Sequence, residues 1–295
     1  MRSEQRADAL VLGAPAKVNL FLEILGKRAD GYHELETLMV AVQLHDELEL
    51  KEEGSGTVEL TCDHPGLSSG PDNLIHKAAD VLRRRTGTTR GARIALRKRI
   101  PLAAGLAGGS SDAAATLVGL NRLWQLGLSD EELATLAAEV GSDVAFFLQG
   151  EAAWCTGRGE IVTPVACKTP LSFVLICPPV GLSTAAVYRA TEVPEQPVPS
   201  AAMRGAFEAG DVEAIGRQLH NRLQPAAERL CPAVADIRRR VEPLRPAGQQ
   251  MSGSGTSYFA LCRDLDEARR IAQELSHGWA EEERPLVIQV SGIGL

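Results

Sequence analysis

The chain has 295 residues, of which 44% are hydrophobic and 23% charged. This is the balance of a globular protein long enough for one large domain or two ordinary ones. Its 31 basic residues are outnumbered by 38 acidic ones, and the formal net charge of -7 argues against a general binder of nucleic acids or acidic membranes. We therefore expect no nucleic-acid partner and no membrane partner, and no obligate protein partner is evident.

The cysteines give no sign of a metal site. No C-x-x-C pair and no histidine at zinc-ligand spacing accompanies them, so we expect reduced thiols in a core. The first ten residues mix both charges and lack the apolar stretch of a signal peptide, and no apolar run approaches membrane-spanning length. We expect a cytoplasmic protein.

The N-terminal part of the chain predicts strands. Apolar and polar residues alternate from Lys17 to Ile24, which is the period of a half-buried strand with Lys17 and Asn19 on the same face. A turn is predicted at residues 28–31. Further strands are predicted at 38–42, 48–50, 57–62 and 92–100.

Capping residues mark the predicted helices. Asp72 or Asn73 precedes an apolar-periodic segment, and Ser129 with Glu132 forms a capping box. The second half of the chain again mixes helices and strands. We expect an α+β protein with two domains, residues 1–165 and residues 166–295, and a cleft between them.

The most informative segment is residues 101–115, PLAAGLAGGSSDAAA. Its glycines, Gly105, Gly108 and Gly109, are expected to reach positive φ and turn N–H groups inward. Ser110 and Ser111 then open a helix that runs to Trp124, so helical N–H donors face the loop. This pattern predicts a phosphate-binding loop.

Two common phosphate motifs do not fit this loop. A Walker A loop needs a lysine where Gly109 stands, and a dinucleotide fingerprint needs a glycine where Ala107 stands. A glycine-rich turn that only lets a helix pack close to a sheet is an alternative.

Two further segments favour phosphoryl transfer. Lys17 supplies a cation on a strand, and Asp143 supplies a carboxylate in an apolar stretch, where burial is costly without a partner. A phosphate loop, a cation and a base are what phosphoryl transfer from a nucleotide to an alcohol needs.

The chain resembles the GHMP kinases, the family named for galactose, homoserine, mevalonate and phosphomevalonate. The resemblance rests on residues 15–22 (PAKVNLFL), 28–35 (RADGYHEL), 101–115, 141–144 (GSDV) and 251–256 (MSGSGT). It implies the two-domain GHMP kinase fold, with an N-terminal nucleotide-binding α/β domain, a C-terminal ferredoxin-like α+β domain and the active site in the cleft. Residues 15–22 and 28–35 are similar to the branch that phosphorylates the 2-hydroxyl of a cytidine-diphosphate-linked methylerythritol with ATP and Mg²⁺, in the non-mevalonate pathway of isoprenoid precursors.

The resemblance also implies roles for single residues. Asp143 is expected to be the catalytic base and Lys17 its cationic partner. Tyr32 and Tyr188 are expected to sandwich the cytosine, with Asn19, His33 and Thr184 also contacting the substrate and residues 252–256 closing over substrate and phosphate. The ATP phosphates are expected at Pro101, Leu102, Ala103, Ala104, Gly105, Leu106, Ala107, Gly108, Gly109, Ser110 and Ser111.

Some points depart from the family pattern or stay open. Ala103, Ala104 and Ala107 stand where relatives often have glycine, and alanine there costs little only if φ is negative. Magnesium ligands are not assigned beyond the candidates Ser110 and Ser111. A homoserine or mevalonate type of GHMP kinase and a nucleotide-binding module without catalysis remain alternatives.

Overall fold

The computed structural model describes residues 2–6 and 8–292, which form two compact units. Unit 1 contains Met1–Ala16, Leu44–Leu102 and Ala107–Gly150, and unit 2 contains Lys17–Gln43, Ala103–Leu106 and Glu151–Leu295. Each unit is therefore built from segments that are distant in the sequence. The predicted boundary between residues 165 and 166 stays a prediction.

The sheet of unit 1 has the strand order β1-β2-β3-β5-β4. Its strands β2 and β3 are long, and their far ends belong to unit 2. Strand β1 is antiparallel to β2, β5 is antiparallel to β3, and β4 is parallel to β5. The bounds are β1 Arg2–Arg6, β2 Ala9–Lys27, β3 His33–Glu53, β4 Val58–Cys62 and β5 Gly91–Arg97.

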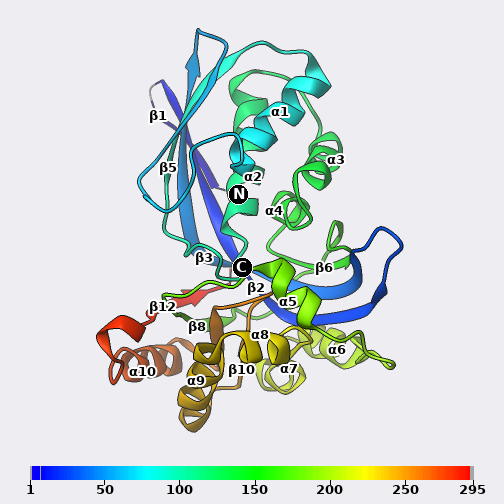
Figure 1. The fold of residues 1–295 in the computed structure, drawn as a ribbon, viewed down its shortest axis with the longest axis vertical. Coiled ribbons are helices and arrows are strands. Elements are labelled where there is room, and N and C mark those ends of the chain that lie inside the picture. The colour runs from blue at the N-terminus through cyan, green and yellow to red at the C-terminus, as the bar shows by residue number, and fades with distance from the viewer. Residues whose placement is uncertain (1, 7, 293–295) are drawn as a thin grey trace. The chain divides into compact units, whose positions relative to one another are not determined.

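Helices lie along one side of this sheet (Figure 1). Asn73 caps the first through its side chain, and Ser129 and Glu132 form the predicted capping box. Helix α2 packs very close to the strands, since a Cβ at Gly119 would lie 2.7 Å from Leu50 Cδ2. The bounds are α1 Leu74–Thr86, α2 Gly108–Leu123, α3 Asp130–Val140 and α4 Val144–Gln149.

Unit 2 contains a second, antiparallel sheet with the order β10-β11-β8-β12. Near β2 and β3 it adds the short strands β6, β7 and β9, of which β9 runs parallel to β2. The bounds are β6 Ala152–Gly157, β7 Ile161–Pro164, β8 Ser172–Cys177, β9 His220–Asn221, β10 Gly248–Met251, β11 Tyr258–Cys262 and β12 Leu286–Ser291.

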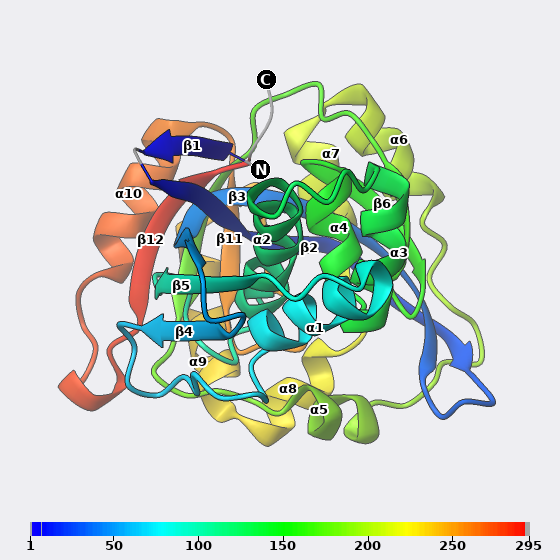
Figure 2. The same cartoon turned by 90° about the horizontal axis from the view of Figure 1, so that it is seen from above.

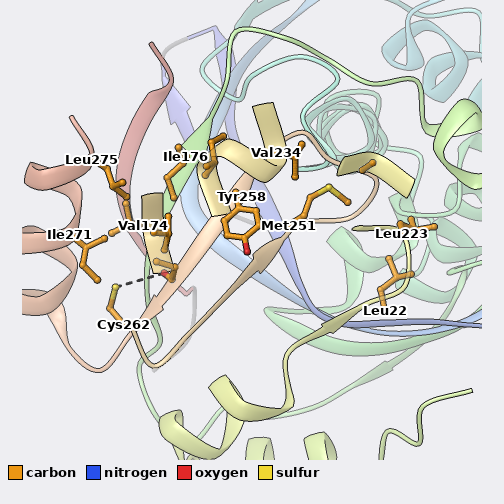
Figure 3. Packing of buried hydrophobic residues seen from close by; sticks show 14 of the residues in the cluster. Leu22, Val174, Ile176, Leu223, Val234, Met251, Tyr258, Cys262, Ile271 and Leu275 are labelled. Atoms are coloured by element: carbon orange, nitrogen blue, oxygen red, sulfur yellow. Dashed lines mark hydrogen bonds between the residues drawn. The ribbon is translucent and has the colours of Figure 1, made fainter. Parts of the chain in front are cut away.

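One face of the second sheet packs into a hydrophobic cluster of unit 2 (Figure 3). Side chains of β8 and β11, such as Val174 and Tyr258, pack against Ile237 of α9 and Ile271 of α10, all of them buried. Both views show α10 beside β12 (Figures 1 and 2). The helices of unit 2 are α5 Thr184–Ala190, α6 Ala201–Ala209, α7 Val212–Gln218, α8 Gln224–Leu230, α9 Pro232–Val241 and α10 Leu265–Leu275, with 3-10 turns at Glu242–Leu244 and Glu281–Glu283.

The α+β class is confirmed, but three local predictions are wrong. The polar face of β2 is not exposed: Lys17 is 3% accessible, Asn19 1% and Glu23 0%. Other segments of unit 2 supply polar partners there, so the strand is buried on both faces. Helix α2 begins at Gly108, before Ser110 and Ser111, and the strand predicted over 92–100 ends at Arg97.

Candidate active site

The predicted phosphate loop reaches positive φ at other residues than expected. Gly105 has φ 74°, as predicted, but Gly108 and Gly109 lie in the first turn of α2. The prediction of positive φ for these two glycines is therefore wrong. Instead Ala103 has φ 50° and Ala107 φ 55°, a conformation that costs alanine about 1–2 kcal/mol. Neither Ala103 nor Ala107 therefore has the negative φ at which alanine would cost little.

The start of α2 suits an anion. The first N–H groups of any helix lack intrahelical acceptors and lie at the positive end of its dipole. Gly109 is exposed, and the nearest atom to a Cβ placed on it would be Leu74 Cδ1 at 3.8 Å. A ligand can therefore approach the backbone there.

Lys17 is brought to the middle of the loop. Its buried Nζ donates to the Gly105 carbonyl oxygen at 2.9 Å and to Asn19 Oδ1 at 2.6 Å. Asn19 Nδ2 in turn donates to Thr37 Oγ1 at 2.8 Å. The period of the strand predicted that Lys17 and Asn19 share a face, and their hydrogen bond confirms it. The asparagine amide thus orients the lysine.

The turn at residues 252–256 packs onto the same place. Ser252 Oγ donates to the Gly105 carbonyl at 3.1 Å, and a Cβ on Gly105 would lie 2.1 Å from the Ser252 oxygen. A Cβ on Gly253, which has φ 54°, would lie 3.0 Å from Lys17 Nζ. Only glycine fits at Gly105 and Gly253, because the backbones approach closely and φ is positive at both.

Sequence reasoning missed the residue that holds this turn. Asn221, 7% accessible, donates from Nδ2 to the carbonyl oxygens of Met251 and Gly253, both at 2.8 Å, and accepts at Oδ1 from Leu223 N. Its only sequence signal is a polar residue shortly before the helix that begins at Gln224. The turn beside Lys17 therefore depends on a side chain from β9.

Three of the residues expected to contact the substrate, Tyr32, His33 and Tyr188, take part in two ring contacts in unit 2. The rings of His33 and Tyr188 lie 5.3 Å apart between centroids, at 31°. Tyr32, 55% accessible, has the Arg158 guanidinium 5.0 Å from its ring centroid. Burial, and then the charge of Lys27, lowers the pKa of His33, which favours the neutral imidazole. Arg158 was not predicted.

The other predicted residues are placed as follows. Thr184 Oγ1 lies 2.9 Å from Ser254 Oγ, which joins the start of α5 to the 252–256 turn. Asp143 is half-buried at the N-terminus of α4, where its side chain makes no capping hydrogen bond. Lys17 belongs to unit 2 and Asp143 to unit 1. Their joint role stays a prediction.

Within residues 2–6 and 8–292, the structure holds no group of three His, Cys, Asp or Glu side chains suited to a metal ion. Ser111 Oγ is buried and has no hydrogen-bond partner among these residues.

No helix in the described part of the chain combines the length and the apolarity that crossing a membrane requires.

Comparison with known proteins assigns the family. The profile of the GHMP kinases N terminal domain matches residues 73–151, and that of the GHMP kinases C terminal domain matches residues 203–281. The 4-diphosphocytidyl-2-C-methyl-D-erythritol kinase of Shouchella clausii is 44% identical over 270 residues, 91% of each chain. That of Pelotomaculum thermopropionicum is 44% identical over 261 residues, 88% of this chain and 91% of the relative.

Solved structures agree with this assignment. A crystal structure of 4-(cytidine 5'-diphospho)-2C-methyl-D-erythritol kinase superposes with a TM-score of 0.78 at 36% identity, covering 96% of this chain and 100% of the other. Homoserine kinase from Cytophaga hutchinsonii, at 22% identity and a TM-score of 0.75 over 98% of this chain and 100% of its own, shares the fold. The chain therefore belongs to the GHMP kinases and, within them, to the family of 4-diphosphocytidyl-2-C-methyl-D-erythritol kinases.

Proposed function

We propose that the chain transfers a phosphoryl group from ATP to the 2-hydroxyl of 4-diphosphocytidyl-2-C-methyl-D-erythritol. This reaction is a step of the non-mevalonate route to isoprenoid precursors, and we propose that it takes place in the cytoplasm. The observation that carries the proposal is the buried Lys17 ammonium, which donates to the Gly105 carbonyl of the phosphate loop. A buried cation beside a phosphate loop suits a reaction that gathers negative charge at the transferred group.

Each part of the site has a proposed task. The first N–H groups of α2, at Gly108 to Ser110, bind ATP phosphates together with the rest of the loop. Lys17 stabilises charge on the transferring group, and Asp143 accepts the hydroxyl proton as the new O–P bond forms and ADP departs. The close packing of Gly105 against Ser252 keeps the loop rigid and so preorganises it.

Magnesium fits this arrangement as an ion held largely by the ATP phosphates. Mg²⁺ in such sites keeps few protein ligands, and the hydroxyls of Ser110 and Ser111 are the candidates. The buried Ser111 Oγ, without a partner in the described part of the chain, fits this role. When bound, the ion would neutralise phosphate charge.

Substrate recognition is proposed for Tyr32, Tyr188, His33, Asn19 and Thr184. Tyr32 presents an accessible ring backed by Arg158, and aromatic rings bind bases by stacking. A neutral His33 can both donate and accept a hydrogen bond, which suits the edge of a cytosine. Small molecules are the proposed partners.

The test is to incubate the purified chain with ATP, Mg²⁺ and a panel of alcohols, namely the cytidine-diphosphate-linked methylerythritol, homoserine and mevalonate. We expect turnover of the first alone. Turnover of homoserine or mevalonate instead would assign the chain to another GHMP activity. ATP binding without turnover of any acceptor would indicate a nucleotide-binding module.

A further inference from the structure

A buried charged cluster lies in unit 1, outside the residues discussed so far. Lys98 Nζ donates to Asp46 Oδ2 at 2.5 Å and to Asp112 Oδ2 at 2.7 Å. The side chains are between 0% and 2% accessible. Asp46 comes from β3, Lys98 directly follows β5, and Asp112 lies in α2. The cluster therefore joins three elements of the unit.

The cluster holds the chain on both sides of the phosphate loop. Asp46 Oδ1 accepts from Arg99 N at 2.5 Å and from Ile100 N at 2.8 Å, the last two residues before Pro101. Asp112 lies in the second turn of α2, just after the loop. The backbone entering the loop and the helix leaving it are thus tied to the same three side chains.

The exit of the loop rests directly on the lysine. A Cβ on Gly108 would lie 2.9 Å from Lys98 Nζ and 3.0 Å from Ile100 Cγ2. Glycine at this position therefore lets the first residue of α2 sit against the ammonium group. The position of the helical N–H donors then depends on where Lys98 is held.

Such a cluster is a poor way to gain stability alone. One ammonium group serves two carboxylates, and Asp112 Oδ1 has no hydrogen-bond partner among the described residues. Buried ion clusters often contribute less to stability than apolar residues of the same size, so the geometry that they fix is the better explanation.

We propose that Lys98, Asp46 and Asp112 are positioning residues for ATP: they fix the spacing between the two ends of loop 101–107, so that the N–H donors at the start of α2 converge on the phosphates. This inference rests on the proposed function, because it assumes that the loop binds ATP. A misplacement of about 1 Å in such a site can cost on the order of a hundredfold in rate.

The experiment measures binding of adenosine, ADP and ATP by calorimetry, which needs no acceptor alcohol. We expect Lys98→Met to weaken binding of ATP about ten- to a hundredfold and that of ADP less. Binding of adenosine should weaken less than about twofold, since the proposal assigns only the phosphates to the loop. A purely structural role would weaken all three ligands alike. Lys98→Met/Asp112→Asn, which also removes a buried negative charge, gives the same readout if the single variant does not fold.

Two matched comparisons sharpen the test. Asp46→Asn keeps an oxygen that accepts from Arg99 N and Ile100 N but places an N–H donor where Oδ2 accepted from Lys98, so it should lose part of the ATP affinity, whereas Asp46→Ala, which removes both sets of contacts, should lose most of it. Arg83→Met removes a half-buried cation of unit 1 that donates to the Gly56 and Arg90 carbonyls, and it should leave ATP binding unchanged.

The outcomes separate the two proposals. If the wild-type chain binds ATP and folded cluster variants bind it equally well, or lose adenosine as much as ATP, the positioning role is overturned while the proposed function stands. If the wild-type chain binds no ATP, the proposed function fails and the inference with it.

Discussion

Replacing Asn221 by alanine should disable the turn beside Lys17 while leaving most of the fold intact. Asn221 Nδ2 donates to the carbonyl oxygens of Met251 and Gly253, both at 2.8 Å, and its side chain is buried. Its Oδ1 accepts from Leu223 N in its own segment, so the printed hydrogen bonds to the turn come from Nδ2 alone. The variant therefore perturbs the turn directly.

The size of the effect follows from these contacts. A buried hydrogen bond contributes about 1 kcal/mol net, and an acceptor left unpaired costs about 1–3 kcal/mol. Loss of both hydrogen bonds leaves two acceptors unpaired and should therefore cost about 2–6 kcal/mol. Because the Gly253 backbone lies against Lys17 and the Gly105 carbonyl, this loss acts on the lysine and the loop. If this loss reduces the stabilisation of the transition state by about 2 kcal/mol, kcat/KM falls about thirtyfold.

The assay is steady-state kinetics with both substrates, together with thermal unfolding. The matched variant is Asn221→Asp, which keeps the size of the side chain and the oxygen that faces Leu223 N but lacks both N–H donors. It should lose at least as much activity as Asn221→Ala, because a carboxylate then faces two carbonyl oxygens. A wild-type kcat/KM in Asn221→Asp would show that the hydrogen bonds from Asn221 do not hold the turn in its active conformation.

Three further predictions use other parts of the site. Tyr32→Ala should raise the KM for the cytidine substrate about ten- to a hundredfold with little change for ATP, because a stacked base contributes about 1–3 kcal/mol; an unchanged KM removes Tyr32 from the site. Gly109→Val should keep the unfolding temperature, since the position is open and helical, but should raise the Kd of ATP about tenfold or more; an unaltered Kd would mean that the loop only packs. Burial opposes ionisation of Glu23, yet hydrogen bonds from Arg222 and His220 hold its pKa well below the usual range. The ionised Glu23 therefore stabilises the fold at a pH above the unfolded pKa of about 4.3, and this stabilisation is lost as the pH falls through the folded pKa. Glu23→Gln should therefore lower the unfolding temperature at pH 7, and the difference in unfolding temperature between variant and wild type should become smaller below about pH 4. Equal unfolding temperatures at pH 7 would contradict this.

Local signals in the sequence were sufficient for several elements of the first half of the chain and for part of the site. Alternation with a period of two residues placed Lys17 and Asn19 on one face of β2, and their hydrogen bond bears this out. The capping residues Asn73 and Ser129 marked the starts of α1 and α3 correctly. Such features depend on neighbours within a few residues, so they can be predicted from the sequence alone.

Contacts between distant segments could not be predicted. Glu23 is buried because Arg222, 199 residues away, binds it at 2.7 Å through two nitrogens. Lys98 looks like an ordinary charged residue at the end of a strand until Asp46 and Asp112 are seen beside it. The positive φ of Ala107 follows from where α2 begins, which is fixed by packing and not by the glycines alone.

We propose that Asp143 takes the proton of the acceptor hydroxyl in this kinase. The most direct measurement is kcat of Asp143→Asn and of the wild-type chain on the cytidine-diphosphate-linked methylerythritol, with both substrates saturating. The asparagine keeps the shape but cannot take the proton, and general-base catalysis contributes roughly 10² to 10⁴ in rate. We predict a fall in kcat of that size with little change in either KM, in a variant that unfolds at the wild-type temperature. A folded Asp143→Asn chain with near wild-type kcat would contradict the role of Asp143 as general base.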